Sequence, residues 1–213
     1  ATDSKAGQAT RDIAQEWLAD IEVLNDQFGD AQVTYQALRD RTFNRSAIRR
    51  LEVKLYAVQN QSRAKALIEF LSFSRDRSKA KHRVERLYRQ FPTDQMVRYL
   101  RARHLFSHKH YLSAHQMLLD LRGQSLPTPI RLEIDRLLVI IGFREHCYVS
   151  AQAQYEGIVD AYASILTAGE IDQFRSWSRR AKFFADSSLM KQYSCPLEID
   201  NPIKPNHDVL DQE

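Results

Sequence analysis

Four histidines close together in the chain are the side chains whose types and spacing most resemble a metal site. They are His104, His108, His110 and His115. His104 and His108 are four residues apart, so on a helix they would share one face and could bind a metal ion. No Glu or Cys accompanies them at ligand spacing, and the His-Glu-x-x-His motif is absent. The other interpretation is a polar helix end and a turn before Tyr111, and we expect neither a metal nor another cofactor.

Catalytic motifs give no stronger signal. The sequence contains no Gly-x-Ser-x-Gly, no Walker loop and no Gly-x-Gly-x-x-Gly. Glu133 with Asp135, or Glu145 beside His146, could be combined into an acid–base pair. Any helical protein of this size offers such pairs, so the sequence predicts no catalytic residues and no enzyme.

Charge is distributed unevenly along the chain. Between Arg39 and Arg103 there are 18 Lys and Arg against 6 Asp and Glu, whereas the first 30 residues carry 7 acids and 2 bases. The densest basic run consists of Arg75, Arg77, Lys79, Lys81, Arg83, Arg86 and Arg89. Such a run could bind phosphates through counterion release. A solvated helix face, an acidic protein partner and the chain's own acidic ends are alternatives, and nucleic acid is disfavoured because aromatics are not interleaved with the bases.

The two cysteines leave the compartment open. Cys147 and Cys195 could form one disulfide in an oxidising compartment, or could be two unrelated thiols. The chain begins at Ala1 without Met, which suits a mature periplasmic or secreted form or a trimmed chain, and a cytoplasmic location is the alternative. The longest apolar run, Leu137 to Ile141, is far shorter than the ~20 residues that span a bilayer.

The pattern along the chain predicts an all-α protein. Only six Gly and six Pro occur in 213 residues, and so few breakers favour long helices. Apolar residues at helical spacing predict helices over about 10–28, 31–41, 46–59, 63–73, 79–91, 95–107, 111–121, 129–141, 146–166 and 167–187. Gly29 is expected to cap the first of these helices, and Gly142 to end or kink the eighth. Thr167 and Glu170 have the spacing of a capping box.

Two consecutive stretches, 61–94 and 95–128, match each other at a spacing of 34 residues. The first carries Ile68, Ala80, Val84, Leu87 and Pro92, and the second carries Ala102, Tyr111, Ala114, Leu118, Leu121 and, one place late, Pro127. A 34-residue period with a small residue early in the second helix and a proline at the end is typical of a helix–turn–helix repeat. We expect Ala102 and Ala114 to be buried where helices cross closely.

This pattern resembles the tetratricopeptide-repeat (TPR) family, well over 61–128 and loosely over 30–60 and 129–165. The large aromatic that the family has early in each first helix is replaced by Ala64 and Arg98, and the mid-helix glycine by Ile68 and Ala102. The resemblance implies an α-solenoid of about three to four stacked antiparallel helix pairs, because a single pair cannot bury its apolar face alone. It also implies a concave groove lined by the first helices, of the kind that binds peptides.

The expected groove residues follow from that resemblance. They are Lys65, Glu69, Tyr99, Arg103 and Phe106, which would present neighbouring rows partly exposed to solvent. The sequence therefore predicts one helical-repeat domain over 1–192, followed by an extended acidic tail over 193–213. The expected function is a non-enzymatic scaffold or adaptor that binds a peptide or protein partner, with a regulatory domain carrying a nucleic-acid-binding stripe at about 75–103 as the alternative.

Overall fold

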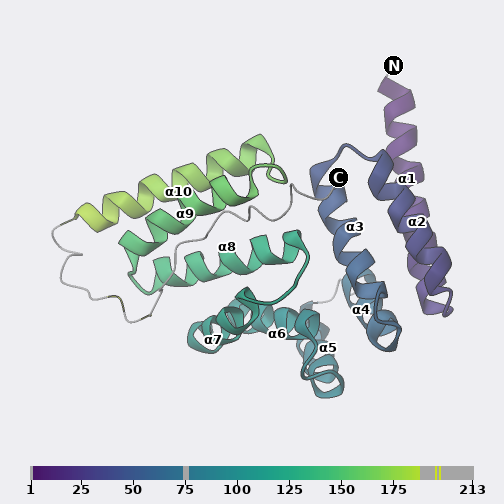
Figure 1. The fold of residues 1–213 in the computed structure, drawn as a ribbon, viewed down its shortest axis with the longest axis horizontal. Coiled ribbons are helices and arrows are strands. Elements are labelled where there is room, and N and C mark those ends of the chain that lie inside the picture. Colours follow the sequence, from purple (N-terminus) through teal and green to yellow (C-terminus); the bar gives the residue numbers. More distant parts are fainter. Residues whose placement is uncertain (1, 74–76, 188–194, 196, 198–213) are drawn as a thin grey trace. The chain divides into compact units, whose positions relative to one another are not determined.

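A computed structural model describes residues 2–73, 77–187, 195 and 197 of the chain, and the backbone alone of residues 2–6, 73 and 77–81. Within this described part the chain forms ten α-helices and no β-strand, which confirms the all-α prediction (Figure 1). None of these helices is long and apolar enough to cross a membrane. The predicted tail over 193–213 lies outside the described residues except for Cys195 and Leu197.

The helix bounds agree with the predicted ones to within a few residues at most ends. The helices are α1 (Thr2–Leu24), α2 (Phe28–Arg41), α3 (Arg45–Val58), α4 (Gln61–Phe73), α5 (Arg77–Gln90), α6 (Gln95–Ser107), α7 (Tyr111–Arg122), α8 (Thr128–Arg144), α9 (Tyr148–Tyr162) and α10 (Ala168–Asp186).

Two of the predicted glycine signals were wrong, and one capping prediction was right. Gly29 lies inside α2 rather than capping α1, and α8 continues through Gly142 to Arg144. The Thr167 hydroxyl accepts from the Glu170 N–H and the Glu170 carboxylate accepts from the Thr167 N–H, so the capping box at α10 is confirmed.

Three helix–helix corners share one geometry that needs no glycine. Asp26, Lys109 and His146 adopt φ values of 65°, 64° and 65° between α1 and α2, α6 and α7, and α8 and α9. In each corner the next N–H donates to a carbonyl five residues back, at 2.9, 3.0 and 2.8 Å. This is the hydrogen bond of a Schellman motif, in which a left-handed residue ends the helix.

The residues after each corner also correspond. An aromatic residue begins the next helix in all three cases: Phe28, Tyr111 and Tyr148. Three residues further on comes a small side chain that is at most 1% exposed: Ala31, Ala114 and Ala151. Ala102 is also fully buried, so the predicted burial of Ala102 and Ala114 is confirmed.

The chain divides into two compact units, and each is described by itself. Unit 1 comprises residues 1–104 with 125–129, and unit 2 comprises 105–124 with 130–213. In unit 1, α1 packs against α2 and α4, α2 against α3, and α3 against α4, so these four helices close a ring of contacts. Tyr35 of α2 and Leu67 and Ile68 of α4 are among its largest fully buried side chains.

Unit 2 is built around α8, α9 and α10, which lie beside one another in Figure 1. Its core joins Val139 of α8 and Ile158 of α9 to Phe174 of α10. A disulfide links Cys147, at the start of α9, to Cys195, which confirms the first of the two interpretations of the cysteines.

Candidate binding site between helices α1, α3 and α4

A row of charged side chains connects α1 to α3 inside unit 1. Glu16 and Asp20 lie one turn apart on α1, and Arg50 and Lys54 lie one turn apart on α3. The two pairs, Glu16 with Arg50 and Asp20 with Lys54, are each separated by 34 residues in sequence. Equal offsets show that α1 and α3 run in the same direction here, and the side-chain bonds form successive rungs between them.

The rungs have the geometry of strong charged hydrogen bonds. Arg50 grips Glu16 with two parallel bonds, Nε to Oε1 at 2.8 Å and Nη2 to Oε2 at 2.7 Å. Lys54 Nζ donates to both oxygens of Asp20, at 2.7 and 2.8 Å, and lies 2.8 Å from Glu16 Oε1. Tyr35 of α2 completes the cluster, because its hydroxyl donates to Asp20 Oδ1 at 2.5 Å.

The cluster lies deep in the helical packing. The side chains of Glu16, Asp20 and Lys54 are 9%, 0% and 5% exposed, whereas that of Arg50 is 51% exposed. Burial by itself would raise the pKa of Glu16, but the hydrogen bonds from Arg50 and Lys54 outweigh it and lower the pKa. Burial, and then the bond to Asp20, raises the pKa of Tyr35. Glu16 is therefore held as a carboxylate and Tyr35 as a neutral phenol.

A cavity of about 430 Å³ lies beside this cluster. The charged cluster forms its floor, and the walls are mostly apolar, with Ile13 and Trp17 from α1, Val53 from α3 and Leu71 from α4. Ile13 and Trp17 are 49% and 54% exposed. The hydroxyl of Ser72 also lines the cavity and makes no hydrogen bond within the described part of the chain.

This arrangement is suited to binding rather than to acid–base chemistry. Lys54 bonds to two carboxylates, Arg50 to one, and the Tyr35 proton is directed at Asp20. Because every ionisable group of the cluster is engaged by another member, none stands ready to transfer a proton to a ligand. The cavity itself offers a half-exposed indole and aliphatic walls, which favour an apolar group.

Two further cavities are more polar. One, of about 470 Å³, surrounds the turn between α5 and α6, and is lined by Tyr56, Pro92 and Asp94 among others. The other, of about 380 Å³, lies between α9 and α10 and is lined by Glu156 and Arg179 among others. Neither combines a half-exposed large apolar side chain with a buried charged floor, so the cavity beside α1 is the stronger candidate.

The predicted groove residues do not line any of these three cavities. Tyr99 is only 5% exposed, so the expectation that it faces solvent was wrong. It lies on the same face of α6 as Met96 and Leu100, and that face is turned into the core. Glu69 and Arg103 are exposed, which leaves their role in binding a prediction.

The other two groove residues have local partners. Lys65 Nζ lies 2.6 Å from the carboxylate of Asp26, and both side chains are exposed. The ring of Phe106 is half-buried, with its centroid 5.6 Å from that of Tyr111. Phe106 belongs to unit 2 and Lys65 to unit 1, so a common groove for them stays a prediction.

The basic run is described only in part. Arg75 lies outside the described residues, as do the side chains of Arg77, Lys79 and Lys81. Arg86 and Arg89 are exposed on α5 and Arg83 is half-buried. A nucleic-acid-binding stripe over about 75–103 therefore stays a prediction.

Asp135 and Glu133, which the sequence offers as one conceivable acid–base pair, have different partners. Asp135 is buried and accepts from the Tyr162 hydroxyl at 2.6 Å, and Arg122 lies 2.9 Å away, whereas Glu133 accepts from Arg136. Burial outweighs these contacts and raises the pKa of Asp135.

The histidines do not gather into a metal site in the described residues, where no group of three or more His, Cys, Asp or Glu side chains could hold a metal ion. His115 is buried in α7, and this burial lowers its pKa. His108 Nδ1 lies 3.0 Å from the Ser107 hydroxyl, and His146 Nδ1 lies 2.8 Å from the Tyr148 hydroxyl.

A comparison of the chain with protein-family models, with curated proteins and with solved structures finds no match.

Proposed function

We propose that this chain is a non-enzymatic, TPR-like scaffold that binds a peptide segment of a partner protein in the cavity between α1, α3 and α4. One observation carries the proposal: the indole of Trp17, 54% exposed, forms a wall of the 430 Å³ cavity. Tryptophan is among the side chains enriched at the few positions that dominate the free energy of a protein interface.

The repeat character of the chain supports this type of scaffold. The rungs from Glu16 to Arg50 and from Asp20 to Lys54 repeat the 34-residue period, now between α1 and α3. Helices related by the period lie side by side in stacked helix pairs and line one surface. The cavity walls at Trp17 and Val53 come from this pair of helices.

The charges at the cavity define the partner's chemistry. Glu16 and Asp20 are buried, so the charge that remains exposed is the guanidinium of Arg50. Its bonds to Glu16 use two of the five N–H groups of an arginine, which leaves donors for a second carboxylate. The partner segment is therefore an apolar side chain next to an acidic residue.

The two tryptophans allow a direct test. Replacing Trp177 by Phe leaves Trp17 as the only tryptophan, so its fluorescence reports on the cavity alone. Peptides selected from a random library on the wild-type protein should carry an aromatic or aliphatic residue beside Asp or Glu, and should shift the Trp17 emission to shorter wavelength.

The affinities of two variants then show which side chain contributes most of the binding free energy. Trp17→Ala should weaken binding of the selected peptides about thirtyfold or more, as expected for a hot spot worth ~2 kcal/mol. Leu18→Ala is the matched control, because Leu18 is 57% exposed on the same helix but does not line the cavity. Peptides that bind the folded Trp17→Ala protein with wild-type affinity would refute the proposal.

A further inference from the structure

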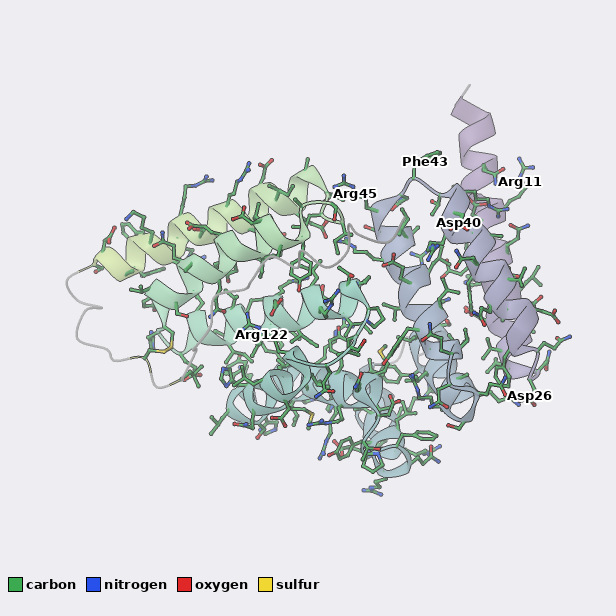
Figure 2. All side chains as sticks on the ribbon, in the orientation of Figure 1. Arg11, Asp26, Asp40, Phe43, Arg45 and Arg122 are labelled. Atoms are coloured by element: carbon green, nitrogen blue, oxygen red, sulfur yellow. A yellow bond between two sulfur atoms is a disulfide. The ribbon has the colours of Figure 1, made fainter. Side chains whose placement is uncertain are left out.

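The loop between α2 and α3 carries the most exposed aromatic ring among the large apolar side chains that the structure describes. Phe43 is 98% exposed, and Figure 2 shows it on the loop between the two helices. An apolar ring held fully in water gains nothing from the fold, because no apolar surface of its own is buried.

The loop holds this ring in place through its own hydrogen bonds. The Thr42 N–H donates to the Leu38 carbonyl, which closes α2. The Asn44 side chain accepts from the N–H groups of Ser46 and Ala47 at 3.0 and 3.2 Å, which caps α3. These bonds end both flanking helices and leave Phe43 in the middle of a short connection between Arg41 and Arg45.

The surroundings of Phe43 are cationic. Residues 39–49 contain one acid, Asp40, and four arginines: Arg39, Arg41, Arg45 and Arg49. Arg39 pairs with Asp40, and Arg41 with Asp12 and Gln15, through exposed contacts. Exposed pairs of this kind are weak and are readily exchanged for a stronger anion.

We propose that this loop docks on an anionic lipid surface, with Phe43 inserted at the headgroup boundary and the surrounding arginines on the lipid phosphates. Such a surface has an outer layer of anionic phosphates, which suits the arginines, and an apolar layer beneath it, which suits the phenylalanine ring. Single-stranded nucleic acid is the other polyanion to consider, but it is bound on several successive aromatic rings. Phe43 has no ring partner in the described part of the chain.

The disulfide also favours a lipid surface over nucleic acid as the partner of this loop. Cys147 and Cys195 are bonded, and disulfides are rare in the cytosolic and nuclear proteins among which most nucleic-acid binders are found. The inference is independent of the peptide cavity, because Phe43 does not line it.

The test is co-sedimentation of the full chain with phosphatidylcholine vesicles that contain or lack phosphatidylglycerol. Wild-type protein should bind only the anionic vesicles, and less at ~200 mM than at ~50 mM salt. Phe43→Ser should lower the partition coefficient about tenfold or more, and Arg45→Gln about fivefold. Phe183→Ser, which removes a 71% exposed ring from α10, is the matched control and should bind like wild type.

A competing single-stranded oligonucleotide separates the two polyanions. Circular dichroism of each variant shows that the helices are intact, so that lost binding is not unfolding. The proposal is overturned if wild type fails to bind anionic vesicles, if Phe43→Ser binds them as well as Phe183→Ser, or if the oligonucleotide binds wild type more tightly than the vesicles do.

Discussion

At the scale of single residues, the buried charges of unit 1 act as a set. Asp20 accepts from Tyr35 and Lys54, and Glu16 accepts from Lys54 and Arg50, so one lysine neutralises parts of two carboxylates. Such a network contributes little net free energy compared with an apolar core, but removing one member is costly. Lys54 is the member on which both carboxylates depend.

Lys54→Met should therefore destabilise the protein strongly. The side chain keeps its length, but Asp20 and Glu16 lose their shared cation inside the helical packing, which typically costs ~3–5 kcal/mol. Lys65→Met is the matched control, because Lys65 pairs with Asp26 at the surface and the loss should be at most ~1 kcal/mol. Urea unfolding measures both, and equal losses would show that Lys54 is not a buried partner of the two acids.

At the scale of helices, the corners explain how the chain reverses direction with so few glycines. Asp26, Lys109 and His146 adopt the left-handed conformation that is usually occupied by glycine at the end of a helix. Asp tolerates this conformation, whereas lysine gains nothing from it and bears the steric cost of its Cβ. The buried alanine five residues later lets the two helices of each corner approach closely.

Lys109→Gly should therefore stabilise the protein, by about 1 kcal/mol, since glycine removes the Cβ contact at positive φ. His108→Gly is the control at the neighbouring position, where φ is not positive, and should not stabilise. Thermal unfolding of the two variants distinguishes them. A lower melting temperature for Lys109→Gly than for wild type would contradict the left-handed corner.

At the scale of the whole chain, each unit contains one tryptophan, Trp17 in unit 1 and Trp177 in unit 2. The disulfide belongs entirely to unit 2 and spans 48 residues. A cross-link of this span restricts the unfolded chain by up to ~4 kcal/mol, although measured values are often 2–4 kcal/mol. Its effect should appear in the unit that it closes.

Replacing both Cys147 and Cys195 by Ser should lower the urea midpoint reported by Trp177, in a Trp17→Phe background, by the equivalent of ~2–4 kcal/mol. The midpoint reported by Trp17, in a Trp177→Phe background, should change little. If both tryptophans report the same shift, the two units unfold as one and the disulfide stabilises the chain as a whole.

Local signals in the sequence were enough for the helices but not for the site. Helical spacing of apolar residues located all ten helices of the described part of the chain, because that period is a property of each segment alone. The capping box at Thr167 could be read directly, whereas Gly29 and Gly142 misled because a glycine inside a helix costs only ~1 kcal/mol and packing can overcome it. The opposite charges 34 residues apart, Glu16 with Arg50 and Asp20 with Lys54, were a usable signal that the search for apolar matches missed.

The sequence by itself determined the all-α class, the approximate helix bounds and the candidate cysteine pair. Which helix faces are buried depended on the tertiary packing. An apolar stripe in the sequence does not determine how much of that helix face a neighbouring helix will bury. Packing buried Tyr99, which the family resemblance placed partly at the surface, and left Trp17 half exposed. The candidate site exists only because α1, α3 and α4 bring together residues between 13 and 72. These residues are too far apart in the chain for any local sequence pattern to relate them.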